Sequence, residues 1–225
     1  MTKANRELSI PVGDINLRGL LEVAPDDAGI VVFVHGSGSS RLSPRNQRVA
    51  GFLREGRLGT LLFDLLTPEE EQVDAFTRQL RFDIELLTQR LLGATDWLVE
   101  RSGANRPFAY FGASTGAAAA LIAATRTRHS VSSVVSRGGR PDLAGSALAQ
   151  VRAPTLLIVG GNDPQVLELN RLALGALDCE KHLAIVPGAT HLFEEPGTLR
   201  QAAALARDWL VEHFEGNASD VVTGG

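Results

Sequence analysis

The sequence predicts an α/β protein in which helices cover both faces of a mostly parallel β-sheet. Six short apolar runs recur along the chain, and each is too continuous for a strand with one exposed face. Helix-like segments alternate with these runs, as they do in parallel sheets with helical crossovers. No repeat and no Pro/Ser-rich linker divides the 225 residues, so we expect one domain over residues 1–215.

The predicted elements follow one another in a regular order. Residues 7–12 and 15–23 alternate apolar and polar side chains around Gly13-Asp14, which indicates an antiparallel β-hairpin. Buried strands are expected at residues 30–34, 60–63, 107–111, 131–136, 155–159 and 182–186. Helices are expected at residues 46–54, 82–100, 114–125, 141–150, 165–177 and 199–214. The acidic run 69–71 is typical of a solvated helix start, and the small, polar tail 216–225 is expected to be disordered.

Composition excludes several classes of protein. The chain has 22 lysines and arginines against 26 acidic residues, a net charge of −4, which argues against nucleic-acid binding. Its single cysteine, Cys179, cannot form an internal disulfide or a cysteine-rich zinc module, and it fits a reducing compartment. The chain shows no signal-peptide pattern and no apolar run long enough to span a bilayer, so we expect a cytoplasmic protein without a membrane partner.

The pentapeptide Gly112-Ala113-Ser114-Thr115-Gly116 follows a predicted strand and directly precedes an Ala-rich helical stretch. This placement is typical of a nucleophile elbow, a sharp strand-to-helix turn that lifts a serine hydroxyl above the sheet. Residues without bulk on either side let the neighbouring backbone approach closely. A five-residue match is common by chance in chains rich in Ala, Gly and Ser, but its position between a strand and a helix makes Ser114 the candidate nucleophile.

A serine nucleophile needs a histidine base and a carboxylate that orients the base. Asp163 lies just past the predicted strand 155–159, at the edge of a parallel sheet where catalytic groups gather. His191 lies in the loop before the last helix, which completes the chain order Ser, Asp, His. The alternative is that Asp163, followed by Pro164, only caps a helix. The other candidate histidines occupy positions typical of exposed or packed side chains.

Acyl transfer also requires hydrogen-bond donors for the developing oxyanion. The backbone amide of Thr115, directly after the nucleophile, is one candidate. The loop His35-Gly36-Ser37-Gly38 follows the first buried strand, and its Ser37 amide is the second candidate. Alternatively, His35-Gly36 is only a tight turn that leaves a strand.

These motifs resemble the α/β-hydrolase superfamily, and within it the dienelactone hydrolase-like proteins, over nearly the whole chain. The resemblance implies a mostly parallel eight-stranded sheet, an acyl-enzyme mechanism, and neither cofactor nor metal. Two departures stand out. Dienelactone hydrolases proper have a cysteine where this chain has Ser114, and they have a Tyr-x-Arg element where this chain has Asp64-Leu65-Leu66-Thr67-Pro68. Dienelactone itself is therefore an improbable substrate, and the His35 loop is more similar to that of serine esterases.

Only 18 residues, 137–154, separate the strands at 131–136 and 155–159, too few for a helical lid domain, so an open site is expected. Arg41 follows the oxyanion loop, Arg137 follows the strand 131–136, and both are candidates for binding an anionic substrate; alternatively, they are solvated or paired with acids. We therefore expect a serine hydrolase of small carboxylic esters or lactones. An acyltransferase or peptidase with the same triad, or a binding protein without turnover, are the alternatives. Trp97 and Trp209 would suit a homodimer surface or, more commonly, the core.

Overall fold

Eight strands form one sheet in the computed structural model, which describes residues 6–103 and 106–223. The strand order is β1-β2-β4-β3-β5-β6-β7-β8. The strands are β1 (Arg6–Val12), β2 (Ile15–Glu22), β3 (Ile30–Val34), β4 (Gly59–Phe63), β5 (Phe108–Ala113), β6 (Val131–Arg137), β7 (Thr155–Gly160) and β8 (Lys181–Val186). β1 pairs with β2 and β2 with β4 in antiparallel fashion, and all other pairs are parallel. The predicted hairpin and the predicted mostly parallel sheet are both confirmed.

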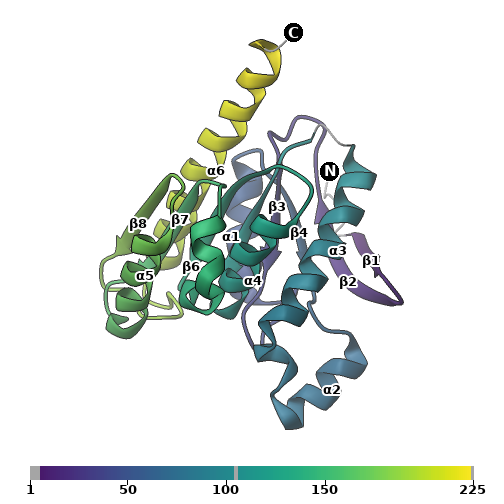
Figure 1. Cartoon of the computed structure of the whole chain (residues 1–225), viewed down its shortest axis with the longest axis horizontal. Coiled ribbons are helices and arrows are strands. Elements are labelled where there is room, and N and C mark those ends of the chain that lie inside the picture. The colour runs from purple at the N-terminus through teal and green to yellow at the C-terminus, as the bar shows by residue number, and fades with distance from the viewer. Residues whose placement is uncertain (1–5, 104–105, 224–225) are drawn as a thin grey trace.

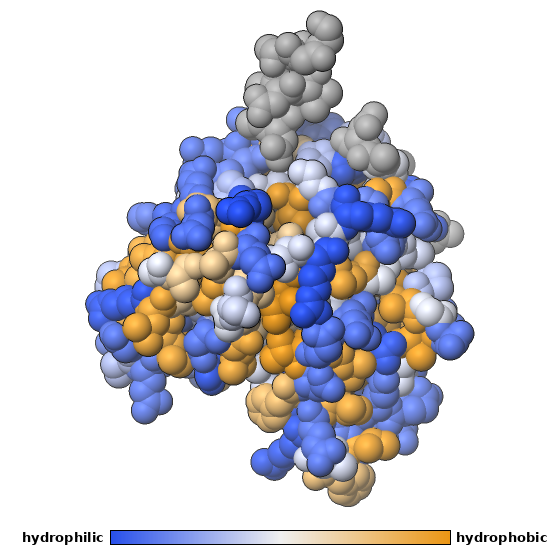
Figure 2. Space-filling view, in the orientation of Figure 1, coloured by the Kyte–Doolittle hydropathy of each residue, from blue (hydrophilic) through white to orange (hydrophobic). Residues whose placement is uncertain are grey.

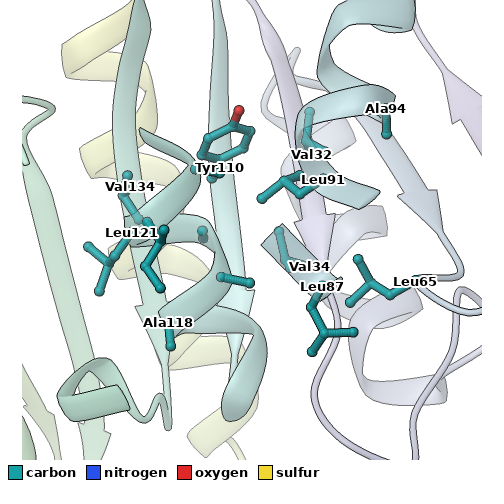
Figure 3. Close-up of a cluster of buried hydrophobic side chains, with 14 of the residues drawn as sticks. Val32, Val34, Leu65, Leu87, Leu91, Ala94, Tyr110, Ala118, Leu121 and Val134 are labelled. Carbon is teal, nitrogen blue, oxygen red and sulfur yellow. The ribbon is translucent and has the colours of Figure 1, made fainter. Parts of the chain in front are cut away.

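Helices cover both faces of this sheet (Figure 1). They are α1 (Pro44–Glu55), α2 (Pro68–Thr77), α3 (Ile84–Ser102), α4 (Thr115–Arg126), α5 (Pro164–Ala176) and α6 (Thr198–Thr223), with two 3₁₀ segments, η1 (Leu80–Phe82) and η2 (Pro141–Gln150). One buried apolar cluster joins the sheet to α3, α4, η2 and α5, and Figure 3 shows its α3–α4 part. A second cluster joins the opposite face to α1 and α6. Trp97 packs against the first cluster and Trp209 against the second.

The strand register brings several loops together at one edge of the sheet. Val34 at the end of β3 pairs with Gly112 near the end of β5, and Ala113 pairs with Arg137 at the end of β6. Because these strands are parallel, the segments that follow them leave the sheet side by side. This carboxyl edge is where ligands bind in open α/β sheets.

Several element ends differ from the predicted ones for local reasons. Helix α1 begins at Pro44, because the Ser43 hydroxyl accepts a hydrogen bond from the Asn46 amide and Pro suits the first turn. The segment 141–150 is a 3₁₀ segment broken at Gly145, where φ is 54°. Helix α6 continues to Thr223 and so includes most of the segment that we expected to be disordered, while residues 224–225 lie outside the described residues.

Helix α2 projects from the body of the fold (Figure 1). Its start confirms the interpretation of the acidic run, because Thr67 and Glu70 form a capping box in which each side chain binds the other's backbone amide. Figure 2 shows apolar surface at this projecting end, and Phe76 there is 91% exposed. Only η2 lies between β6 and β7, so no lid domain is inserted there. Within the described residues, no helix is long and apolar enough to cross a membrane.

Candidate active site

Ser114 occupies a strained turn between β5 and α4. Its φ is 50° and its ψ is −124°, in a region where a non-glycine residue costs about 1–3 kcal/mol. The two glycines of the motif make the turn possible. A Cβ on Gly112 would lie 2.4 Å from the Ala117 Cα, and one on Gly116 would lie 2.2 Å from the Val34 carbonyl oxygen. The motif therefore reflects backbone packing on both sides of the serine.

His191 and Asp163 form a hydrogen-bonded pair. The distance from His191 Nδ1 to Asp163 Oδ2 is 2.8 Å, with 39% of the histidine side chain and 14% of the aspartate side chain exposed. Asp163 does precede α5, but its side chain makes no capping hydrogen bond. The Asp163 carboxylate therefore does not cap helix α5. Because the carboxylate accepts at Nδ1, the imidazole Nε2 is left as the nitrogen that can act as a base.

The end of β6 connects this pair to Ser114. The Ser114 amide donates to the Arg137 carbonyl at 3.4 Å, and a Cβ on the next residue, Gly138, would lie 3.7 Å from His191 Nδ1. The three sequence-predicted residues thus surround one strand end. Within the part of the chain that the structure describes, Ser114 Oγ makes no hydrogen bond. Catalytic hydrogen bonds of this kind often tighten only when substrate is bound.

A second His–Asp pair lies elsewhere. His129 Nε2 is 2.8 Å from Asp96 Oδ1, but His129 precedes β6 and so lies at the opposite, amino-terminal edge of the sheet. His213 contacts the Trp209 carbonyl within α6. Among the described residues neither histidine contacts the serine turn, whereas His191 and Asp163, which chain order predicted as partners, are hydrogen-bonded to each other.

Sequence reasoning missed Glu195, which holds the loop of His191. Its two carboxylate oxygens accept hydrogen bonds from the hydroxyl and the amide of Thr190, at 2.6 Å and 3.0 Å. These bonds from Thr190 lower the pKa of Glu195 below its ordinary value. A Thr and a Glu five residues apart form no recognised motif, so no sequence signal pointed to this contact.

The loop after β3 packs directly on the serine turn. A Cβ on Gly36 would lie 2.8 Å from the Ser114 Cβ, and the Ser37 amide donates to Thr115 Oγ1 at 3.0 Å. The structure therefore brings both predicted oxyanion residues, Ser37 and Thr115, together beside Ser114. The Ser37 amide is nevertheless bonded to a side chain.

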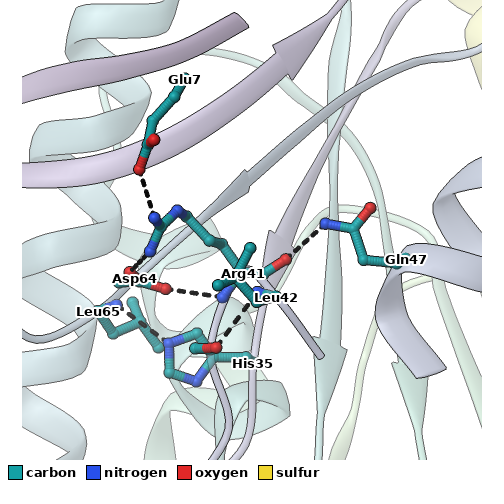
Figure 4. Close-up of polar contacts among 8 residues, drawn as sticks. Glu7, His35, Arg41, Leu42, Gln47, Asp64 and Leu65 are labelled. Atoms are coloured by element: carbon teal, nitrogen blue, oxygen red, sulfur yellow. Dashed lines mark hydrogen bonds and ion pairs between the residues drawn. The ribbon is translucent and has the colours of Figure 1, made fainter. Parts of the chain in front are cut away.

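His35 connects this loop to Leu65, just after β4 (Figure 4). Its buried Nε2 accepts a hydrogen bond from the Leu65 amide at 3.0 Å, and Nδ1 donates to the Gly36 carbonyl at 2.9 Å. Burial lowers the pKa of His35, so the ring is neutral. His35-Gly36 is thus more than a tight turn, because it connects the ends of β3 and β4.

The predicted role of Arg41 in substrate binding needs correction. Its guanidinium pairs with Asp64 and Glu7, and its amide donates to the second Asp64 oxygen at 2.7 Å (Figure 4). The side chain is 9% exposed. Gln47 Nε2 also donates to the Arg41 carbonyl at 2.6 Å. With its donors directed at these two carboxylates, Arg41 connects the loop to β1 and β4.

Arg137, at the end of β6, is buried more deeply than the predicted open rim would require. It is 8% exposed, and within the described residues it pairs with no carboxylate. Nη2 donates to Asn46 Oδ1 at 3.2 Å, Nη1 is buried without a partner, and the guanidinium lies 6.0 Å from the ring centres of Phe111 and Phe193. Burial and the charge of Arg45 lower the pKa of Arg137 to about 10, so it stays cationic at neutral pH.

A cavity of about 550 Å³ borders the oxyanion loop. Serine and glycine residues of the loop line one side, and Leu65, Leu66 and Leu87 supply an apolar wall. The wall also carries charges of both signs, from Arg45, Arg81, Glu71 and Asp74, and Arg81 pairs with Asp74 at 2.5 Å. Its size suits a small organic molecule. In the described part of the chain, no three His, Cys, Asp or Glu side chains gather in a way that could hold a metal ion.

The sheet order, the helices on both faces and the strained serine turn place the chain in the class of α/β hydrolases. A dienelactone hydrolase from Anabaena variabilis is 54% identical, with a TM-score of 0.89 over 92% of this chain and 97% of that one. This chain belongs to the dienelactone hydrolase-like family. More distant structures share the fold. Est1E from Butyrivibrio proteoclasticus is 14% identical with a TM-score of 0.77, covering 93% and 99% of the two chains. No protein-family model matches the chain.

Two curated proteins from strains of Mycobacterium tuberculosis are 55% identical over 213 residues. The match covers 94% of this chain but 47% of each relative, so the chain spans about half the length of the curated relatives it matches. Both carry the name phosphoribosyl transferase. That name describes the longer proteins as wholes.

Proposed function

We propose that this chain is a serine hydrolase of carboxylic esters or lactones that works through an acyl-enzyme. The observation that carries the proposal is the strained Ser114 turn beside the hydrogen-bonded His191–Asp163 pair. The turn exposes one hydroxyl at the carboxyl edge of the sheet, and the pair supplies a base with a defined free nitrogen. Family membership, with a dienelactone hydrolase at 54% identity, supports the same chemistry.

In the proposed reaction, His191 Nε2 takes the proton from Ser114 as Oγ attacks the ester carbonyl. The carbonyl oxygen becomes an oxyanion, and amides at the start of α4 stabilise its charge. Collapse breaks the ester bond, and His191 returns the proton to the leaving alcohol. Water then attacks the acyl-enzyme with His191 as the base again, which releases the acid and restores Ser114. Asp163 holds the imidazole orientation and stabilises the imidazolium.

A fluorophosphonate probe tests this proposal, with the intact mass as the readout. We expect the wild type to gain one adduct, and Ser114→Ala and His191→Ala to gain none on the same timescale while they keep wild-type circular dichroism. Ser146→Ala and His182→Ala, changed at exposed positions, are matched controls that should label normally. A folded wild type without labelling would contradict the proposal and favour a binding protein.

We also propose that the preferred esters carry a negative charge. Arg137 is a buried cation without a carboxylate partner within the described residues, next to the nucleophile turn. A buried, uncompensated charge acts through a low-dielectric interior and is poorly screened. It therefore favours a substrate anion near the nucleophile turn, where the charge of Arg45 also acts on Arg137.

Arg137→Met tests this preference at similar side-chain volume. We expect the ratio of kcat/KM for a half-ester of a dicarboxylic acid over its neutral methyl diester to fall about tenfold. Arg128→Met removes the same charge from a mostly exposed position at the other edge of the sheet and is the control. An unchanged ratio in Arg137→Met would refute the preference for anionic substrates.

A further inference from the structure

The Ser37 amide has one proton, and the structure commits it to a side chain. It donates to Thr115 Oγ1 at 3.0 Å, a normal length for a hydrogen bond between an amide and an oxygen. The loop cannot easily rotate this amide elsewhere. His35 ties it to Leu65, and Gly36 lies so close to the Ser114 turn that a Cβ would be 2.8 Å from the Ser114 Cβ.

The Thr115 hydroxyl has the opposite property, because its own proton is free. A hydroxyl has one donor and two acceptor sites. Among the described residues, Thr115 Oγ1 accepts the Ser37 amide and makes no other hydrogen bond. Accepting one bond polarises the O–H group and makes it a better donor. Thr115 is 4% exposed and directly follows the nucleophile at the start of α4, and its hydroxyl contacts the loop that packs on the Ser114 turn.

We propose that Thr115 is a catalytic residue whose hydroxyl donates a hydrogen bond to the oxyanion. In this arrangement Thr115 contributes two donors, its backbone N–H and its O–H, and the Ser37 amide acts through the hydroxyl. The Ser37 amide therefore orients and polarises the donor and does not touch the substrate. This inference rests on the proposed serine-hydrolase function and specifies which groups stabilise its transition state.

Thr115→Val is the main test, because it replaces the hydroxyl by a methyl group of nearly the same shape. Loss of one oxyanion donor lowers kcat by about 10²–10³-fold in other hydrolases, and we expect a similar loss here. KM for a neutral ester should change little, because the oxyanion forms only in the transition state. Thr115→Ser keeps the hydroxyl and should retain most of the wild-type kcat. Thr115→Ala, which adds no bulk, gives the same information if the valine variant does not fold.

Binding of a transition-state analogue supplies a readout that a merely structural role would not change. A boronic acid that forms a tetrahedral anionic adduct with Ser114 should bind Thr115→Val more weakly, by about the same factor as the loss in kcat/KM. A non-reacting substrate analogue should bind both proteins equally, and the thermal midpoints should agree.

The outcomes separate this inference from the proposed function. An active wild type with a folded Thr115→Val that keeps the wild-type kcat would overturn the role of Thr115. A wild type with neither labelling nor turnover would overturn both. A large loss of kcat that serine restores, matched by weaker boronate binding, would support the role of the hydroxyl.

Discussion

At the scale of single residues, the geometry of the site requires glycines, which have no Cβ, at three positions around Ser114. Gly36, Gly112 and Gly116 leave room for backbone to lie against backbone around Ser114. A side chain at Gly36 or Gly116 would push the end of β3 and its loop away from the Ser114 turn, and one at Gly112 would push the start of α4 away from β5. The glycines of the motif are therefore steric requirements of the site, although none of them takes part in the chemistry.

Gly116→Ala should destabilise the protein and disrupt the site together. Its Cβ would lie 2.2 Å from the Val34 carbonyl oxygen and 2.6 Å from that of His35, both of them backbone atoms that cannot rotate away. We expect the free energy of unfolding to fall by at least about 2 kcal/mol, measured by urea denaturation. Gly175→Ala is the control, because nothing lies within 4 Å of that Cβ and alanine in helix α5 should add about 0.5–1 kcal/mol. Equal stability of the two variants would disprove the packing argument.

His35 predicts a dependence of stability on pH. Burial lowers the pKa of the folded ring below its ordinary value of 6.5, so below that pH the unfolded chain binds more protons than the folded one. The stabilising contribution is complete above pH 6.5 and is lost as pH falls from there toward the folded pKa.

The measurement is the free energy of unfolding between pH 8 and pH 5 for the wild type and for His35→Gln, whose side chain cannot titrate. We expect the difference between the two proteins to shrink as pH falls, by up to about 1.4 kcal/mol per pH unit. A difference that stays constant over this range would mean that His35 titrates normally in the folded protein.

At the scale of elements, the segment between β3 and α1 is held by a buried ion pair. Arg41, 9% exposed, contacts Asp64, 6% exposed, at the end of β4, and it also reaches Glu7 on β1. These contacts with β1 and with the end of β4 thereby fix the position of the loop. Arg41→Met leaves the Asp64 charge buried without its partner, so we expect a loss of about 3–5 kcal/mol in chemical denaturation.

Arg45→Met provides the comparison. The side chains of Arg45 and Glu194 are 37% and 64% exposed, so their ion pair should contribute less than about 1 kcal/mol. The double variant with Asp64→Asn should recover part of the loss in Arg41→Met, because no unpaired buried charge remains. Similar losses in the two arginine variants would refute the difference in burial as the cause.

The limits of prediction from sequence also lie at this scale. Alternation predicted β1 and β2, and apolar runs predicted the other six strands, because strands buried on both faces contain little else. For β8, burial on both faces was a wrong expectation: this strand lies at the end of the sheet, and Ile185 is 42% exposed. Chain order predicted which His and Asp pair. The environments of Arg41 and Arg137 were not predictable. Glu7, Asp64 and Asn46 reach these arginines from other elements, and no local pattern records such contacts. Thr115 was predicted only as an amide donor, since a hydroxyl's partner across the site is invisible in the pentapeptide.

At the scale of the whole molecule, two core clusters lie on opposite faces of one sheet, and each contacts one tryptophan. The chain has two tryptophans, so Trp97→Phe and Trp209→Phe each leave a single reporter. In each variant we expect the unfolding midpoint from tryptophan fluorescence to equal the midpoint from circular dichroism, because the sheet couples both faces into one cooperative unit. Separate midpoints would indicate that the faces unfold independently. The experiment also tests whether this chain folds without the additional length of its Mycobacterium tuberculosis relatives.

The close contact between the loop after β3 and the Ser114 turn also determines which part of the site can move. Loop amides usually exchange their protons with solvent quickly, but the Ser37 amide lies in a rigid backbone contact and should exchange only when the core opens. The loop of His191, in contrast, depends on exposed bonds between Thr190 and Glu195. We therefore expect the loop of His191, the proposed base, to fluctuate more than the Ser37 loop, and its backbone amides to exchange faster with solvent.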